Sequence, residues 1–152
     1  MKFEVASHSD VPDLSRLLES LFTQEAEFKP DQEAQVRGLE LIINNSEIGS
    51  ILVARNNNKL VGMVNLLYSI STALGARVGL LEDMVVSPSA RGAGIGSKLI
   101  EFALSYAQEH GCKRITLLTD RDNEGAHKFY LKHGFFRSSM VPFRTSLGSK
   151  NA

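Results

Sequence analysis

The first third of the chain combines one short apolar run with two stretches of helical spacing. Residues 2–7 predict a strand. The leucines after it recur every three or four residues, as on the buried face of a helix: Leu14, Leu17, Leu18 and Leu21. Asp10 is a suitable N-cap for that helix, with Pro12 in its first turn. Residues 22–30 indicate a helix end and a loop, and residues 31–44 predict a second helix with three inward positions, Val36, Leu39 and Ile43.

The middle of the chain has the pattern of strands separated by turns. Residues 51–54 and 60–70 predict a hairpin, because Asn56-Asn57-Asn58 between them tolerates the left-handed backbone of a tight turn. Residues 71–79 are less regular, and Gly75 and Gly79 predict a second turn there.

The strongest signal runs from Leu80 to Tyr106. The apolar run at 80–86 predicts a buried strand, which Ser87-Pro88 ends. Arg91-Gly92-Ala93-Gly94-Ile95-Gly96 comes next, and the chain then enters a helix with one apolar stripe: Ile95, Leu99, Phe102, Ala103 and Tyr106. A strand, a glycine turn and a helix therefore follow one another without a spacer.

The last third predicts four more elements: a strand at 115–119, a helix at 123–133 closed by Gly134, and final strands at 135–137 and 141–147. Together these elements predict a single α/β domain over residues 1–152. Its sheet is mixed and mostly antiparallel, with helices on both faces. The central strand–helix–strand unit, residues 80–119, should have parallel strands and a right-handed crossover. Ligands collect at the carboxyl ends of such strands, where the glycine turn lies.

Composition narrows the class of protein. With 43% hydrophobic and 22% charged residues, the chain is typical of soluble globular proteins. The single cysteine, Cys112, has no internal partner, which suits a reducing cytoplasm. A small buried hydrophobe is the ordinary role for such a residue, and a catalytic thiol is the alternative. No apolar run reaches the roughly 18 residues of a membrane span, and a signal-peptide core is absent. We expect a cytoplasmic protein without membrane association.

The net charge of zero hides an asymmetry. Residues 10–47 carry nine acidic and three basic side chains, whereas residues 91–150 carry ten basic and five acidic ones. The second part, which contains the glycine turn, suits a polyanionic ligand. The first part does not suit nucleic acid. Solvated helix faces are the ordinary explanation for most of these charges.

The glycine turn has a chemical use. A helix start leaves backbone N–H groups without partners and carries a partial positive charge, and glycines remove the Cβ atoms that would keep a phosphate away. The turn is therefore an anion cradle, unless its glycines serve only to turn and pack the chain. Ser97 stands where the dinucleotide fingerprint needs a third glycine, and the order Gly96-Ser97-Lys98 is wrong for a Walker loop.

Two motifs resemble those of the GNAT family of N-acetyltransferases. Arg91, Gly94 and Gly96 occupy the three defining positions of its Gln/Arg-x-x-Gly-x-Gly/Ala signature. The second signature, Asn-x-x-Ala-x-x-Phe-Tyr-x-x-x-Gly-Phe, is matched at every defining position: Asn123, Ala126, Phe129, Tyr130, Gly134 and Phe135. The resemblance implies the acyl-CoA N-acyltransferase fold and transfer of an acetyl group from acetyl-CoA to an amine by direct attack in a ternary complex.

The resemblance also implies the cofactor contacts. The backbones of Met84, Val85 and Val86 would pair with the pantetheine arm like an added strand. The pyrophosphate would be held by the turn and its backbone N–H groups: Arg91, Gly92, Ala93, Gly94, Ile95, Gly96 and Ser97. Asn123 would hydrogen-bond the cofactor arm, cap the following helix, or do both. Phe129 would pack on the cofactor or in the core.

Two residues are candidates for proton transfer. Tyr130 occupies the position that the family uses as general acid, and a phenol can protonate the departing thiolate; the alternative is a core tyrosine. Glu82 is the first candidate for the base, directly or through a water, or else a carboxylate paired with an arginine. Strand alternation places Glu82, Met84 and Val86 on one face and Asp83 and Val85 on the other, so one of the two acids should face the acceptor.

The acceptor is expected to be a cationic small molecule of the polyamine or amino acid type. This expectation rests on the acidic first part of the chain, with Glu25, Glu27 and Asp31 near its loop and Glu82 and Asp83 at the central strand. No metal is expected, and a homodimer is left open. The rival hypothesis is a non-catalytic acyl-CoA-binding sensor, which would need neither Tyr130 nor Glu82.

Overall fold

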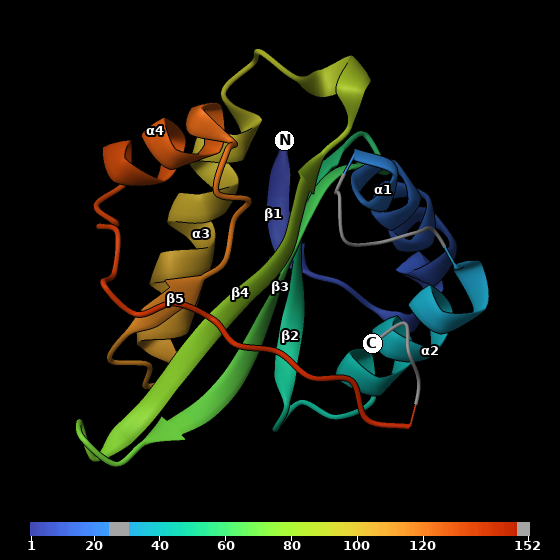
Figure 1. Cartoon of the computed structure of the whole chain (residues 1–152). Helices are drawn as coiled ribbons and strands as arrows, with labels where there is room; N and C mark the ends of the chain where they lie inside the picture. The colour runs from blue at the N-terminus through green and yellow to red at the C-terminus, as the bar shows by residue number, and fades with distance from the viewer. Residues whose placement is uncertain (25–30, 149–152) are drawn as a thin grey trace. The chain divides into compact units, whose positions relative to one another are not determined.

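The computed structural model describes residues 1–24 and 31–148 (Figure 1). Its five strands form one sheet in the order β1-β2-β3-β4-β5: β1 (Lys2–Val5), β2 (Gly49–Asn56), β3 (Lys59–Ser71), β4 (Ala76–Val86) and β5 (Ile115–Leu117). The first three neighbouring pairs are antiparallel, and β4 and β5 are parallel. The predicted mixed, mostly antiparallel sheet with a parallel strand–helix–strand unit is confirmed.

Helices cover both faces of this sheet. A 3-10 turn, η1 (His8–Asp10), leads into α1 (Val11–Gln24), which is followed by α2 (Gln32–Ile43). A second 3-10 turn, η2 (Pro88–Ala90), precedes α3 (Ile95–Glu109). Figure 1 shows α1 and α2 on one side of the sheet and α3 on the other. The helices that the leucine spacing and the Ile95 stripe predict are therefore both present.

The side of the sheet under α1 and α2 holds a hydrophobic core. It includes several fully buried side chains, among them Leu14, Leu39, Ile51, Val53 and Met63. Burying a side chain of this size stabilises the fold by about 1.5–3 kcal/mol. On the α3 side, Ala54, Val61 and Ile95 form a cluster that packs with Phe3 and Val86. The start of α3 is thus anchored in the core through Ile95.

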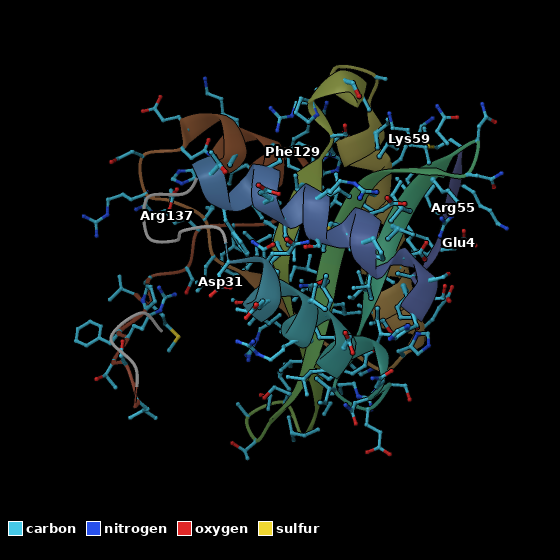
Figure 2. All side chains as sticks on the ribbon, turned by 90° about the vertical axis from the view of Figure 1, so that its right-hand side faces the viewer. Glu4, Asp31, Arg55, Lys59, Phe129 and Arg137 are labelled. Carbon is cyan, nitrogen blue, oxygen red and sulfur yellow. The ribbon has the colours of Figure 1, made fainter. Side chains whose placement is uncertain are left out.

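Asp31 and Asp10 have different local roles. Asp31, labelled in Figure 2, precedes α2. Its carboxylate accepts a hydrogen bond from the Ala34 N–H at 3.2 Å, the usual N-cap contact. Asp10, expected to cap the first helix, lies at the end of η1, and its carboxylate accepts the Ser7 N–H at 2.9 Å. The same carboxylate is bound by Arg55 from β2 at 3.0 and 3.1 Å. The carboxylate of Asp10 therefore ties β2 to η1.

The turn between β2 and β3 is as predicted, but the next turn is not. Asn57 and Asn58 have positive φ, 51° and 68°. The second turn contains Gly75, whereas Gly79 lies inside β4, so its prediction as a turn residue is wrong. A Cβ on Gly79 would lie 2.7 Å from Ile115 Cδ1 and 2.8 Å from Leu66 Cδ1. Gly79 is needed for close packing between strands, and this requirement arises only from the tertiary structure.

Residues from Arg121 onward form a second compact unit, which is described by itself. It contains α4 (Glu124–Lys132), followed by Gly134 with a φ of 90°. Between Gly134 and residue 148 no strand is described, so the predicted strands at 135–137 and 141–147 are wrong. An apolar run becomes a strand only where its backbone groups meet a partner edge, and the aromatic side chain of Phe143 is 96% exposed. No helix in residues 1–24 and 31–148 has the length and apolar character needed to cross a membrane.

Candidate active site

One edge of β4 is only partly paired with a neighbouring strand, and we call the unpaired part the opening of the sheet. β3 pairs with β4 from Ala76 to Val86, but β5 pairs with it only at Gly79, Leu80 and Leu81. Among the described residues, no strand lies on that side of β4 beyond Leu81. The three residues predicted to pair with a pantetheine arm, Met84, Val85 and Val86, lie in this part of β4. An extended amide-containing ligand could add to that edge as a further strand would.

A β-bulge lies in the same stretch. Val85 pairs with Met63 and Glu82 with Asn65, so two residues of β4, Asp83 and Met84, lie opposite a single residue of β3. The φ of Asp83 is 56°, in the left-handed region. The predicted alternation of Glu82 and Asp83 on opposite faces is therefore wrong here, because a bulge interrupts the two-residue period. Glu82 lies opposite Asn65, and the side chain of Asn65 also reaches Asp83.

Asn65 and Asp83 form a hydrogen-bonded pair. Asn65 Nδ2 donates to Asp83 Oδ2 at 2.9 Å, and Asn65 is only 4% exposed. The other amide atom, Asn65 Oδ1, is buried without a hydrogen-bond partner among the described residues. Burial and, to a lesser extent, the charge of Glu82 raise the pKa of Asp83 from 3.8 to about 6, against the opposing effect of the Asn65 hydrogen bond. Glu82 itself is exposed.

The glycine turn connects η2 to α3. Arg91 Nε donates to the Val86 carbonyl at 3.2 Å, which fixes the turn to the end of β4. Gly92 and Gly94 have φ values of 89° and 77°, so the turn alone accounts for glycine at both positions. The Lys98 N–H bonds to the Gly94 carbonyl at 3.2 Å, which closes the first turn of α3 beside the glycine turn.

The space in front of this turn is open. A Cβ added to Gly92 or Gly94 would meet no protein atom within 4 Å, so these glycines do not serve close helix–sheet packing. The side chain of Ile95 is buried in the core, which leaves only its backbone for a ligand. Arg91 and Ala93 are exposed, and Gly96 and Ser97 are half-buried. Open space beside the N-terminus of a 15-residue helix suits the pyrophosphate of an acyl-CoA.

The remaining predicted residues lie in the second unit. The Asn123 side chain accepts the Ala126 N–H at 3.0 Å and caps α4, so the capping role is confirmed. The Phe129 ring lies 5.2 Å from the Tyr130 ring and 4.8 Å from the His133 ring, measured between centroids. Burial raises the pKa of the Tyr130 hydroxyl above its ordinary value of 10.0. A phenol with a raised pKa keeps its proton at neutral pH, as a general acid must.

Several acidic residues of the first part of the chain are already paired. Arg55 binds both Asp10 and Glu4, and Figure 2 shows Arg55 and Glu4 close together. Asp13 pairs with Arg16 on α1. Glu25 and Glu27 lie outside the described residues. Glu82 and Asp83 follow directly on Leu81, the last residue of β4 that pairs with β5. No cluster of three or more metal-ligating side chains occurs within residues 1–24 and 31–148.

Comparison with known proteins places this geometry in a family. The sequence model of the acetyltransferase (GNAT) family matches residues 12–135. The chain belongs to the GNAT family. It is 31% identical over 118 residues to the uncharacterized N-acetyltransferase YhfO of Bacillus subtilis, covering 76% of this chain and 78% of that protein. It is 33% identical over 86 residues to the aminoalkylphosphonate N-acetyltransferase of Salmonella typhimurium, covering 57% and 56% of the two chains.

Solved structures agree with this assignment. The fold superposes on a putative acetyltransferase from Agrobacterium tumefaciens with a TM-score of 0.81 at 26% identity, covering 97% of this chain and 100% of the other. This GNAT member is an acetyl-CoA-dependent N-acetyltransferase. The relatives named N-acetyltransferases favour an enzyme over the non-catalytic sensor that the sequence left open.

One residue of the site was missed from the sequence. Asn65 is the single polar residue in the apolar run from Leu60 to Leu67. A polar side chain in such a run is a signal for a buried hydrogen bond, since an unsatisfied buried amide is unfavourable. The signal did not identify its partner, because Asp83 is on another strand and comes within reach only through the bulge.

Proposed function

We propose that this GNAT enzyme transfers the acetyl group of acetyl-CoA to the primary amine of a cationic small molecule, of the polyamine or amino acid type, by direct attack in a ternary complex. The observation that carries the proposal is the position of two carboxylates, Glu82 and Asp83, where β5 leaves the edge of β4. The glycine turn follows the carboxyl end of the same strand, β4. The proposed site for the acetyl donor and the proposed site for the cation are thus next to each other along the chain.

The resemblance to the family motifs suggests the cofactor contacts. Bound acetyl-CoA would supply an activated thioester as acetyl donor. The backbone of Met84, Val85 and Val86 would hold its pantetheine arm, and the turn from Arg91 to Ser97 would hold its pyrophosphate. Asn123 and Phe129 would contact the arm as well. We expect the enzyme to act in the cytoplasm, where the buried Cys112 stays a thiol.

Acetyl transfer requires two proton movements. An alkyl ammonium of pKa about 10.4 must lose a proton before it can attack, which costs about 4–5 kcal/mol at neutral pH. Glu82, exposed at the opening, would attract the cation and is the base suggested by the sequence; Asp83 beside it is the second carboxylate. Tyr130 would give its proton to the departing sulfur.

Charge favours a cationic acceptor. Glu82 and Asp83 bring two acidic groups together at the opening, and neither has a basic ion-pair partner among the described residues. An anionic acceptor would be repelled by this pair. The similarity to an aminoalkylphosphonate N-acetyltransferase makes a zwitterionic aminoalkylphosphonate the competing acceptor, although the matched region is 57% of this chain.

The proposal is tested by a panel assay that measures CoA thiol release from acetyl-CoA. The panel contains polyamines, basic and neutral amino acids, aminoglycosides, peptide N-termini and an aminoalkylphosphonate. We expect the highest kcat/KM for a polyamine or a basic amino acid. If the best substrate is the aminoalkylphosphonate or a neutral amine, the acceptor assignment is wrong and acetyl transfer itself stands. If CoA binds and no amine is acetylated, the proposed catalysis is wrong.

A further inference from the structure

We propose that the C-terminal arm, defined as residues 136–147, pairs as a strand with β5 of a second copy of this chain. Two copies exchange their arms about a twofold axis and form a homodimer. The proposal concerns assembly and is independent of which amine the enzyme acetylates.

Exposed apolar side chains are concentrated in the arm. Two aromatic and three other large apolar residues there are 67–96% exposed: Phe136, Met140, Val141, Phe143 and Leu147. The last residue before the arm differs from them, because the half-buried Phe135 ring lies 5.6 Å from the Tyr130 ring of α4. Monomeric soluble proteins rarely expose contiguous apolar patches larger than a few hundred Å², and larger patches mark interaction surfaces. The arm therefore has the composition of a buried segment and the exposure of an unpartnered one.

The arm also has the sequence pattern of a strand. Val141, Phe143 and Leu147 would share one face of an extended chain, and the residues of the opposite face between Phe143 and Leu147 are polar. Pro142 has no N–H and suits the start of a strand, so pairing is expected after it. The structure nonetheless describes no strand in residues 134–148 (Figure 1). The arm is thus a strand-forming segment that lacks an edge to pair with.

Strand β5 has such an edge. It is the last strand of the sheet and, within the described part of the chain, pairs with β4 alone. Ile115 and Leu117 are only half-buried, and Leu118 just beyond the strand is 53% exposed. Parallel strands are ordinarily covered on both faces, and sheet edges are ordinarily paired, covered or blunted. A further strand beside β5 would bind its outer row of backbone groups and cover these apolar side chains.

A second copy of the chain is the partner that has both features. Each copy carries one arm without an edge and one edge without a neighbouring strand, so a twofold exchange satisfies all four at once. An unrelated protein with a free strand edge would pair the arm and leave β5 uncovered. In the homodimer, main-chain hydrogen bonds hold the added strand, and the apolar face of the arm packs on Ile115 and Leu117.

The area available matches what a stable dimer needs. Phe136 and Phe143 are 84% and 96% exposed, so nearly their whole surface can be buried on association. A buried phenylalanine covers about 150–250 Å², which gives about 600–1,000 Å² for the phenylalanines of two arms. The partner surface beneath them is of similar extent, so the total is about 1,200–2,000 Å², the range of stable protein interfaces.

The first test measures the oligomeric state of the full chain by sedimentation velocity over a range of concentrations. We expect the wild type to be a dimer. An anchoring ring in an interface commonly contributes about 30-fold to affinity and occurs twice in a twofold dimer, so Phe143→Glu should raise the Kd about a thousandfold. Ile70→Glu is the matched control, because this side chain on β3 is 71% exposed and lies outside the arm. It should leave the dimer intact.

Three results of this test would overturn the proposal: a wild type that is monomeric at every concentration, a dimer that Phe143→Glu leaves unchanged, or equal losses in the two variants. Equal losses would mean that the chain associates through exposed apolar surface in general. CoA binding by calorimetry verifies that Phe143→Glu is folded, as we expect for a ring that is 96% exposed within its own chain.

The second test identifies the edge and the copy that receive the arm, and it needs no destabilising variant. Thr145→Cys, in the middle of the paired part of the arm, and Thr116→Cys, in the middle of β5, are made separately in a Cys112→Ala background. The two proteins are unfolded and refolded together and treated with a short bis-maleimide. We expect a two-chain product in which mass spectrometry finds residues 116 and 145 linked. Lys2→Cys, on β1 at the opposite edge of the sheet, replaces Thr116→Cys as the control and should give no link to residue 145.

The same pair of cysteines distinguishes exchange from pairing within one chain. A chain that carries both Thr116→Cys and Thr145→Cys would become linked internally if the arm added to its own β5. Internal links together with no link between the mixed single variants would show that the arm is not exchanged, and the proposal would be wrong. Links between copies in a protein that acetylates no amine would keep the dimer and reject only the proposed catalysis.

Discussion

Replacing Gly94 by alanine tests phosphate binding by the glycine turn separately from the contribution of Gly94 to the stability of the fold. Gly94 has a φ of 77°, so any Cβ there strains the backbone by about 1–2 kcal/mol. That Cβ would meet no protein atom within 4 Å, and it would therefore project into the open space where phosphate oxygens are expected. Gly75, with a φ of 61° and equally open surroundings in the β3–β4 turn, is a matched control.

The expected loss of CoA binding free energy follows from the hydrogen bonds that the added Cβ would prevent. A charge-assisted hydrogen bond contributes about 1.5–3 kcal/mol, and the loss of one or two at the start of α3 weakens CoA binding by about 2–4 kcal/mol. We therefore expect the Kd of CoA to rise about 30- to 1000-fold in Gly94→Ala and to stay unchanged in Gly75→Ala. Both variants should lose similar stability in urea unfolding.

Calorimetry with CoA and with pantetheine, which lacks the pyrophosphate, decides the cause. Only CoA should respond to Gly94→Ala if the turn holds phosphates. An unchanged Kd for CoA in folded Gly94→Ala refutes the cradle. An equal loss for pantetheine would mean that the strained turn disturbs the whole site instead.

Three further outcomes are expected. Tyr130→Phe should keep CoA affinity and lower kcat about a hundred- to ten thousandfold, since the hydroxyl acts when the thiolate departs; wild-type kcat would return Tyr130 to a packing role. Arg55→Met should destabilise the fold by about 3 kcal/mol, because Asp10 is left 9% exposed without its ion pair, whereas Arg16→Met on the exposed pair should cost less than about 1 kcal/mol. Burial opposes ionisation of Asp10, but Arg55 and Ser7 lower its pKa overall, so this stabilisation is present at neutral pH and is lost as pH falls below about 4. Equal urea midpoints for both arginine variants at pH 7 would contradict the assignment. Finally, kcat/KM for a cationic acceptor should fall as ionic strength rises from 0.01 to 0.1 M, where the Debye length shrinks from about 30 to about 10 Å; a salt-independent value would exclude long-range attraction.

The sequence by itself determined the features that depend on neighbouring residues. The start of α2 near residue 31, the Asn57–Asn58 turn and the cap of α4 at Asn123 were all predicted, because each depends on contacts within about four residues. The glycine turn before α3 belongs to the same class. Its phosphate-binding role stays a prediction, which rests on backbone donors that any helix start provides.

Tertiary structure decided what depends on segments far apart in the chain. Gly79 was predicted as a turn residue. Glycine is required there because side chains from β3 and β5 occupy the space that a Cβ would need. The final strands at 135–137 and 141–147 failed because apolar character does not supply a partner edge. Arg55 binds Asp10, which is 45 residues away in the chain, and this contact neutralises one of the acidic charges counted in residues 10–47.

The two acids of β4 show the same division most clearly. Their sequence places two carboxylates at the end of the central strand, and strict alternation would send them to opposite faces. Register with β3 inserts a bulge at Asp83, which brings that side chain to Asn65 on the neighbouring strand. The number and type of acidic groups were thus determined by the sequence, whereas their direction, burial and proton affinity depend on pairing with a strand 18 residues away.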